Sequence, residues 1–335
     1  MSRREPNARR DPRKLGRQAS AAAPVRVPGQ PAGEPPAVQL NAQGVTDQGR
    51  VRHNNEDSLA ACDLSTGEIF AGPFELQRRQ GPSGTLLLVA DGMGGEACGE
   101  LASRMCSELL PKQLLKGLGG RQNPSRAEFG SLLCRAVEAA NDAILSQSRA
   151  ELSSCQGMGT TATAAALYGV HLLVAQVGDS RAYLIRNGQL IQLTRDQTFL
   201  NYLIDMGAAE PASESTKDPR KSILVQAVGA TEKLHVALSG VELRRGDRLL
   251  LASDGLSNML KPEELLSIAS LDGSLARRCQ KLVQAANTAG GTDNITVILA
   301  ELSGPGLPLP NPGATVRVET LSAQASVRRP GKPQL

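Results

Sequence analysis

Four short apolar segments follow one another closely in the middle of the chain, and tight turns separate them. They cover residues 160–167, 172–177, 182–185 and 190–193. Asn187-Gly188, between the last two, is a strong signal for a type I′ hairpin turn. Strands joined by such short turns pair antiparallel, because a parallel pair needs a crossover of a dozen residues or more. The sequence therefore predicts an antiparallel sheet.

The segments on either side extend this sheet and add helices. Further apolar segments with the length of strands cover 85–90, 235–241, 248–252 and 295–302. Apolar residues recur at three- and four-residue spacing in two pairs of segments, which cover 97–115 and 126–148, and 262–270 and 274–288. This spacing is typical of amphipathic helices. Two separate helix pairs around antiparallel strands indicate helical layers on the sheet faces and an α+β fold.

Basic segments that are rich in proline flank the patterned region. Residues 1–38 contain eight Lys or Arg and three acids, and 303–335 contain four Lys or Arg and one acid. Neither has a hydrophobic period, so we expect two disordered tails around one domain at 39–302. Aromatic residues make up only 2%. Because nucleic-acid-binding domains carry positive charge on the fold and often stack bases on aromatic rings, we expect no nucleic-acid partner.

The cysteines and the hydropathy indicate where the protein works. The six cysteines form no C-x-x-C pair and only three His are present, which argues against a zinc site. In a chain this long without a signal peptide we expect reduced thiols rather than disulfides. No stretch reaches the roughly 18 apolar residues that span a bilayer. We therefore expect a soluble cytoplasmic protein without a membrane partner and, because no heptad seam is present, a monomer.

Three aspartates share one context, because each follows an apolar strand segment. They are Asp91 after LLLVA, Asp179 after LLVAQVG and Asp254 after RLLLAS. Asp293 has the inverse context and precedes the segment ITVILA. The start of one antiparallel strand lies beside the end of its neighbour, so these four carboxylates can gather at one end of the sheets. Asp57, in the segment RHNNED, adds a fifth.

Crowded carboxylates repel one another and are costly to bury, and a divalent cation resolves both problems. Oxygen ligands without Cys or His favour magnesium or manganese over zinc. Two such ions about 3.5–4 Å apart can bridge a water, lower its pKa to near neutral and so supply a hydroxide that attacks phosphorus. The sequence therefore predicts a metal-dependent hydrolase of phosphate esters. Taken singly, each Asp-Gly is more often only a turn.

Six motifs together carry more weight than any one of them. They are NNED at 54–57, DGMGG at 91–95, GMGTT at 157–161, VGDSRAYL at 177–184, SDGL at 253–256 and GGTDNIT at 290–296. This ordered set resembles the metal-dependent protein phosphatases of the protein phosphatase 2C family, in particular its bacterial branch. The resemblance covers about 40–302. It implies a four-layer α-β-β-α sandwich of two antiparallel sheets flanked by helices, and hydrolysis of phosphoserine and phosphothreonine in proteins.

The resemblance also implies roles for single residues around two Mn²⁺ or Mg²⁺ ions and a weak third. The ligand set would be Asp57, Asp91, Asp254 and Asp293 through their carboxylates, Gly92 through its carbonyl oxygen, Glu56 through water, and Asp179 for the third ion. Arg52 stands at the family's phosphate-binding position, and its guanidinium fork suits a phosphate. A surface ion pair is the alternative for Arg52.

The chain departs from the family pattern at two places, both on the side of the third ion. Asn258 ends the segment SDGLSN where bacterial members usually have an acid, and Gln197 replaces the His of a Thr-x-Asp-His motif. Residues 205–222 are polar and rich in turn formers, which indicates a mobile flap. We expect the segment 253–258 to form a loop that leaves the sheet edge.

The sequence thus predicts a phosphatase that acts on phosphorylated proteins and opposes a serine/threonine protein kinase. One alternative is a regulator with the same fold that binds phosphoproteins and hydrolyses them weakly or not at all. Another is an adaptor that acts through its basic tails. The complete acidic set argues against the regulator, because a decayed site would have lost ligands.

Overall fold

The computed structural model describes residues 37–121, 124–150, 154–210 and 218–321, and they form two antiparallel sheets. The six-stranded sheet has the order β10 (Gln189–Gln192), β9 (Arg181–Arg186), β12 (Arg248–Ala252), β13 (Ile295–Ser303), β1 (Gln39–Asp47) and β4 (Phe74–Arg79). The eight-stranded sheet has the order β14 (Glu319–Leu321), β11 (Ala237–Glu242), β8 (His171–Val177), β7 (Ala162–Tyr168), β5 (Thr85–Met93), β2 (Asp57–Asp63) and β3 (Ile69–Ala71), and β6 (Gly159–Thr160) pairs with the end of β5.

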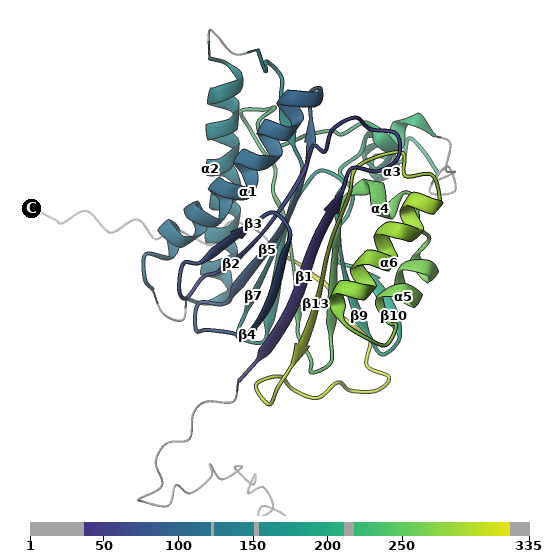
Figure 1. Cartoon of the computed structure of the whole chain (residues 1–335). Coiled ribbons are helices and arrows are strands. Elements are labelled where there is room, and N and C mark those ends of the chain that lie inside the picture. Colours follow the sequence, from purple (N-terminus) through teal and green to yellow (C-terminus); the bar gives the residue numbers. More distant parts are fainter. Residues whose placement is uncertain (1–36, 122–123, 151–153, 211–217, 322–335) are drawn as a thin grey trace, which may run out of the picture. The chain divides into compact units, whose positions relative to one another are not determined.

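Helices cover the outer face of each sheet (Figure 1). The helices are α1 (Glu96–Leu118), α2 (Arg126–Ser148), α3 (Phe199–Asp205), α4 (Asp254–Ser257), α5 (Pro262–Ala269) and α6 (Leu275–Thr288), with a 3₁₀ turn, η2 (Pro219–Ser222). The pair α1 and α2 packs on the eight-stranded sheet, and α5 and α6 pack on the six-stranded sheet. The predicted α+β sandwich of four layers is therefore confirmed.

Strand β7 shows how the sequence produces these layers. All seven of its residues are buried, because both of its faces are covered. Ala164 and Ala166 face the core beneath α1 and α2, whereas Ala165 and Leu167 face the core between the two sheets. A third core lies between the six-stranded sheet and α4 to α6. Small alanine side chains on one face allow the helices to approach the sheet closely.

The predicted turn between β9 and β10 is confirmed. Asn187 and Gly188 have φ angles of 52° and 73°, and positive φ at both central positions is the requirement of a type I′ turn. Asn tolerates this conformation better than other residues with a side chain.

The predicted boundary of the domain at 302 is wrong. Residues Glu319 to Leu321 form β14 and pair with β11 as the edge strand of the eight-stranded sheet. Leu307 is only 1% exposed and belongs to the core between the sheets. At the other end, Val38 is buried and its carbonyl oxygen accepts a hydrogen bond from Gln80. Proline-rich composition hid these contacts, because single apolar residues without a period give no sequence signal. Residues 1–36 and 322–335 lie outside the described residues.

Part of the predicted flap at 205–222 also lies outside the described residues, namely 211–217. The described parts on either side are joined, because the backbone N–H of Phe199 donates to the carbonyl oxygen of Ile223 at 2.8 Å. None of the helices that the structure describes is long and apolar enough to cross a membrane.

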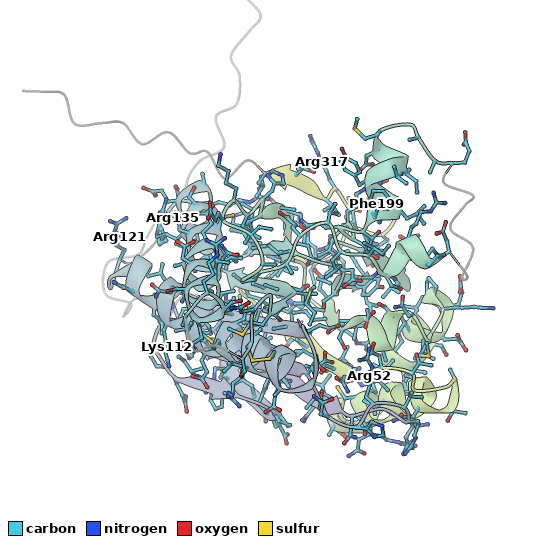
Figure 2. All side chains as sticks on the ribbon, turned by 90° about the horizontal axis from the view of Figure 1, so that it is seen from above. Arg52, Lys112, Arg121, Arg135, Phe199 and Arg317 are labelled. Carbon is cyan, nitrogen blue, oxygen red and sulfur yellow. A yellow bond between two sulfur atoms is a disulfide. The ribbon has the colours of Figure 1, made fainter. Side chains whose placement is uncertain are left out.

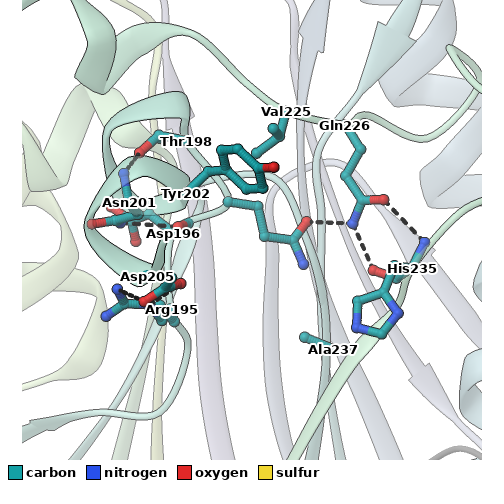
Figure 3. Close-up of a pocket in the computed structure, with 11 residues that line it drawn as sticks. Arg195, Asp196, Thr198, Asn201, Tyr202, Asp205, Val225, Gln226, His235 and Ala237 are labelled. Atoms are coloured by element: carbon teal, nitrogen blue, oxygen red, sulfur yellow. Dashed lines mark hydrogen bonds and ion pairs between the residues drawn. The ribbon is translucent and has the colours of Figure 1, made fainter. Parts of the chain in front are cut away.

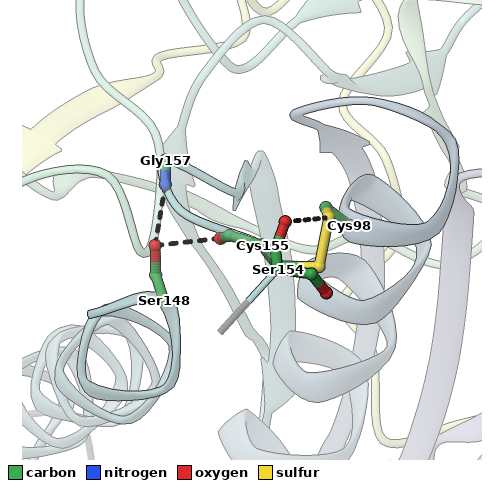
Figure 4. The surroundings of a disulfide bond; sticks show 5 residues. All are labelled: Cys98, Ser148, Ser154, Cys155 and Gly157. Carbon is green, nitrogen blue, oxygen red and sulfur yellow. Dashed lines mark hydrogen bonds between the residues drawn. A yellow bond between two sulfur atoms is a disulfide. The ribbon is translucent and has the colours of Figure 1, made fainter. Parts of the chain in front are cut away.

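The expectation that all cysteines are reduced is wrong for one pair. Cys98, in the first turn of α1, forms a disulfide with Cys155, which precedes β6 (Figure 4). The two residues are 57 positions apart in the sequence. They meet because the pairing of β5 with β6 brings the start of α1 beside the segment before β6. Cys62, Cys106, Cys134 and Cys279 are free and buried.

Candidate metal centre

Two of the predicted ligands lie side by side in the eight-stranded sheet. Asp57 begins β2 and stands opposite Asp91 in β5. The sequence predicted that Asp91 follows the strand. Instead Asp91 belongs to β5, because pairing of β6 with Gly92 and Met93 prolongs that strand. The Oδ2 atom of Asp57 accepts a hydrogen bond of 2.7 Å from Ser253, whereas its Oδ1 atom is buried without a partner among the described residues.

The other two predicted ligands come from the six-stranded sheet. Asp254 follows β12 and Asp293 precedes β13. The predicted loop at 253–258 is instead the short helix α4, in which Asp254 is the first residue. Its carboxylate accepts a hydrogen bond of 3.1 Å from the side-chain amide of Asn258, one helical turn later. The carboxylates that were predicted to gather at one edge therefore come from both sheets.

The aspartates influence one another electrostatically. Burial raises the pKa of Asp57 to about 7, and the charges of Asp254 and Asp293 add to this effect. Burial raises the pKa of Asp91 well above its ordinary value, and the other aspartates raise it further. Burial followed by the charge of Asp293 raises the pKa of Asp254 to about 6, although a side-chain hydrogen bond with Asp91 opposes the change. The protein itself thus compensates the negative charge at this edge only in part, through Arg52 and Arg181.

Asp179 lies in the turn between β8 and β9, beside the other aspartates. Burial raises its pKa to about 8, with further contributions from Asp254 and Asp196. It lines a small cavity of about 80 Å³ that also contacts Asp254 and Asn258. Arg181 lines the same cavity, but Asp196 holds its guanidinium through contacts of 2.6–3.0 Å. The cavity at Asp179, where the resemblance implies a weak third ion, is therefore next to Asp254 and distinct from the space between Asp57 and Asp91.

Arg52, labelled in Figure 2, lies in the segment between β1 and β2 and reaches the same edge through its contact with Asp293. Its Nη2 atom lies 2.7 Å from Oδ2 of Asp293, and its side chain is 48% exposed. Burial lowers the pKa of Arg52, but the charge and the hydrogen bond of Asp293 outweigh this and raise it overall. Arg52 is thus held at the rim by one of the predicted ligands, with its side chain still accessible.

Glycines allow the backbone around the predicted ligands to pack closely. A Cβ atom on Gly92 would collide with the backbone of Gly99, and one on Gly99 would collide with the carboxylate of Glu56. A Cβ on Gly255 would collide with the carbonyl oxygen of Asn294. The Gly of the pairs Asp91-Gly92 and Asp254-Gly255 is therefore required for close packing rather than for a turn, because Gly92 lies in β5 and Gly255 in α4. Glu56 itself is buried at 7% exposure, and its carbonyl oxygen accepts a hydrogen bond from Gly92.

Sequence reasoning missed the residues that hold the ligands in place. The side chain of Asn294 accepts a hydrogen bond from the N–H of Glu56 at 2.8 Å and donates to the carbonyl oxygens of Gln48 and Asn54. The hydroxyl of Thr161 accepts from the N–H of Asp91 at 2.9 Å. Asn294 is next to the predicted ligand Asp293 in the motif GGTDNIT, and this was an available signal. Thr161 ends the motif GMGTT and is 70 residues from Asp91, so only its place in that motif could have indicated it.

A larger cavity lies beside α3, near the predicted flap (Figure 3). Its volume is about 570 Å³, and Tyr202, Val225 and His235 are among the residues that line it. Gln226 crosses it and donates hydrogen bonds to the side chain of Gln197 at 2.8 Å and to the carbonyl oxygen of His235 at 2.6 Å. Gln197, where the family pattern has His, therefore serves as a structural contact of this cavity.

The donor set at the edge suits hard cations, because it consists of carboxylate and carbonyl oxygens without Cys or His. As the side chains lie, no group of three or more Asp, Glu, His or Cys that could hold a metal ion is found within the described part of the chain. Hydrogen bonds with Ser253, Asn258 and Arg52 engage three of the carboxylates instead. Binding of a cation by Asp293 would require Arg52 to turn away, whereas the Oδ1 atom of Asp57 is already without a hydrogen-bond partner among the described residues.

Comparison with known proteins identifies the family. A model of the family described as protein phosphatase 2C matches residues 75–300. The serine/threonine phosphatase stp of Listeria welshimeri is 35% identical over 265 residues, which are 78% of this chain and 96% of that protein. The crystal structure of the serine/threonine phosphatase PstP of Mycobacterium tuberculosis is similar with a TM-score of 0.63 at 34% identity, covering 79% of this chain and 99% of that chain.

A second structure bears on the ions. The catalytic domain of PstP in complex with two manganese ions is similar with a TM-score of 0.61 at 34% identity, covering 79% of this chain and 99% of that chain. The fold is that of a protein serine/threonine phosphatase. The chain belongs to the protein phosphatase 2C family.

Proposed function

We propose that the acidic edge is the catalytic centre and that it holds two Mn²⁺ or Mg²⁺ ions. Asp57, Asp91, Asp254 and Asp293 would be the side-chain ligands. The observation that carries this assignment is the buried Oδ1 atom of Asp57, which has no hydrogen-bond partner among the described residues. Its charged neighbours Asp254 and Asp293 are also carboxylates and so cannot compensate its charge. A buried anionic oxygen of this kind needs a compensating charge.

The remaining residues would complete the site. The carbonyl oxygen of Gly92, in a tightly packed backbone segment, would be a further ligand, and the buried Glu56 would act through water. When bound, divalent cations lower the pKa of a coordinated water and offset charge on the phosphoryl oxygens. Arg52 would bind the substrate phosphate with its planar guanidinium, turning from Asp293 as the cation takes over that carboxylate.

The physiological role follows from the chemistry. We infer that the protein removes phosphate from phosphoserine and phosphothreonine in protein substrates and so opposes a serine/threonine protein kinase. We further propose that it acts as a monomer in the cytoplasm and that residues 1–36 and 322–335 are dispensable for hydrolysis of small esters.

A phosphatase assay with peptide substrates tests the proposal. Hydrolysis of phosphoserine and phosphothreonine peptides should require Mn²⁺ or Mg²⁺ and stop in excess chelator, and a phosphotyrosine peptide should react poorly. The rival, a phosphoprotein-binding regulator, predicts retention of the peptides without release of phosphate at any concentration of metal ion. Turnover that persists in chelator would exclude the two-cation site.

Asn258 sets the affinity for a third cation at Asp179. An Asn offers one carbonyl oxygen but no charge, and affinity for a hard cation follows the charge of its ligands. We predict that Asn258→Asp strengthens the binding of a weak third cation in the cavity that Asp179 and Asn258 line. Calorimetry should show this as a further binding event at a lower Mn²⁺ concentration than in wild type. Asn258→Ala is the matched control, because it also removes the hydrogen bond to Asp254 but adds no charge. Titrations of Asn258→Asp and wild type that superimpose would make the residue at 258 irrelevant to the cation.

A further inference from the structure

The two cysteines of the disulfide differ from the other four in their surroundings. Burial raises the pKa of the Cys62, Cys106, Cys134 and Cys279 thiols to about 12, so these thiols are poor nucleophiles. Cys98 is partly exposed and is the third residue of α1, whose N-cap is Gly95. A helix N-terminus stabilises a thiolate. Cys98 is therefore the cysteine at which exchange with an external thiol or disulfide can begin.

Cys98 lies one residue from the packing contact that positions a proposed ligand. The next residue, Gly99, packs against the backbone of Gly92 and the carboxylate of Glu56 so closely that no Cβ fits on Gly92 or Gly99. The N–H groups of Cys98 and Gly99 both donate to the carbonyl oxygen of Gly95 at 2.9 Å. Movement of this first helical turn would therefore reach Gly92 and Glu56 directly.

Cys155 lies at the start of a segment that supports the same ligands from the other side. Ser148 of α2 fixes it, because its hydroxyl donates to the carbonyl oxygen of Cys155 at 3.1 Å and accepts from Gly157 at 2.9 Å (Figure 4). The chain then passes Met158, whose Cα leaves no room for a Cβ on Gly94, into β6.

Strand β6 connects this segment to Asp91. Thr160 pairs with Gly92, and its hydroxyl donates to the carbonyl oxygen of Asp91 at 2.9 Å. Thr161, the next residue, accepts from the N–H of Asp91 and donates its own N–H to the carbonyl oxygen of Asp91 at 2.8 Å. The disulfide therefore joins covalently the two segments that lie on either side of Asp91 and Gly92.

We propose that Cys98 and Cys155 form a reversible oxidation site that controls how tightly the Asp91–Gly92 segment binds its cations. The proposal rests on the proposed function for the role of these two residues as ligands. The disulfide holds the first turn of α1 and the segment before β6 on either side of the ligands, so that little order remains to be gained when cations bind. Reduction releases the two segments from each other, and cation binding must then order them.

The chemistry is thiol–disulfide exchange with a low-molecular-weight disulfide. The Cys98 thiolate attacks one sulfur of the small disulfide, which forms a mixed disulfide and releases one small thiolate. The Cys155 thiolate then attacks Sγ of Cys98, which forms the protein disulfide and releases the second small thiolate. Two electrons pass from the cysteine pair to the small disulfide, and the two protons of the cysteines end on the released thiols. A dithiol reductant reverses the sequence.

Thermodynamic linkage makes the coupling measurable in both directions. If oxidation strengthens Mn²⁺ binding by a given factor, saturating Mn²⁺ must raise the equilibrium constant for disulfide formation by the same factor. A redox titration with reduced and oxidised glutathione, with and without Mn²⁺, reads this factor from the thiol content alone. It needs no substrate and no turnover.

The experiment compares the full chain in its oxidised and reduced states. Calorimetry with Mn²⁺ should give a dissociation constant at least about fivefold lower for the oxidised protein, within the usual range of coupling between sites. Cys155→Ser should match the reduced wild type and ignore the redox state. Cys106→Ala, on the same helix, is the matched control and should behave as wild type. The glutathione titration should shift with Mn²⁺ by the calorimetric factor.

Each contrary result has a distinct meaning. Equal Mn²⁺ affinity in the two states, or a glutathione equilibrium that Mn²⁺ leaves unchanged, overturns the oxidation switch and leaves the proposed function intact. Failure of both states to bind Mn²⁺ refutes the two-cation centre itself, and the switch with it. If Cys155→Ser does not fold, the comparison of oxidised with reduced wild type decides the question without any substitution.

Discussion

Replacing Asp57 by Asn should lower kcat by at least about 100-fold at saturating Mn²⁺, because the charge stabilisation that a catalytic cation supplies is worth several kcal/mol. The Asn keeps the shape of the side chain and can still accept a hydrogen bond from Ser253, so the fold should be preserved. Asp254→Asn should have a similar effect. Asp272→Asn, at an exposed position between α5 and α6, is the control and should retain wild-type turnover.

The same variant should behave in the opposite way in a stability measurement. Burial raises the pKa of Asp57 to about 7 in the metal-free protein. A raised pKa in the folded state means that the contribution of this carboxyl to stability is present below about pH 4 and is lost as the pH rises through about 7. Asn cannot ionise and keeps its contribution. In chelator, urea unfolding should therefore show Asp57→Asn gaining stability relative to wild type between pH 5 and pH 8.

Together the two measurements separate a functional carboxylate from a structural one. A variant that keeps more than about a tenth of wild-type turnover would remove Asp57 from the metal centre, given the size of the lost charge stabilisation. A variant that loses activity and is also less stable at pH 8 would have a folding defect instead.

Replacing Arg52 by Ala should lower kcat/KM by about 10–100-fold, equivalent to about 1.4–2.8 kcal/mol, if its guanidinium binds the substrate phosphate. The affinity for Mn²⁺ should change little. Asp293 loses its ion pair, but the pair is partly exposed and such contacts contribute little. Steady-state kinetics on a phosphopeptide and calorimetry with Mn²⁺ give the two quantities.

Two further variants sharpen this test. Arg50→Ala removes a cation two residues away on an exposed side chain and should leave the kinetics unchanged. Arg52→Lys keeps the charge but loses the planar fork, so an intermediate kcat/KM would indicate bidentate binding of phosphate. If kcat and KM of Arg52→Ala equal those of wild type, Arg52 is a rim residue that only pairs with Asp293.

The sequence predicted the sheets and the acidic edge because both depend on local patterns. Apolar runs of strand length locate β7, β8, β9 and β12, and an Asp at the end of such a run must lie near the sheet edge. The DGMGG and GGTDNIT segments gave the ligands only together, since a single Asp-Gly is an ordinary turn. The strands β1 and β4 were not located because polar residues interrupt their apolar pattern, and β2 and β3 were not located because their apolar runs, LAAC and IFA, are short.

What the sequence did not predict depends on contacts between distant segments. Ser253 and Asn294 support Asp57 and Glu56 across the two sheets, at separations of 196 and 238 residues. The disulfide needs the close approach of α1 and the segment before β6, which only the pairing of β5 with β6 produces. Strand β14 is three residues long and acquires its structure from the exposed edge of β11.

The division of the ligands between the two sheets has a mechanical consequence. Asp57 and Asp91 belong to one sheet, whereas Asp254 and Asp293 are attached to the other. Small sliding of one layer over the other would change the distances between these pairs while leaving each sheet internally unaltered. The apolar residues packed between the sheets, such as Leu87 and Leu251, therefore determine how far apart the two pairs of aspartates lie. Substitution of these core residues should therefore change the spacing of the proposed ligands, although the core residues do not contact the substrate.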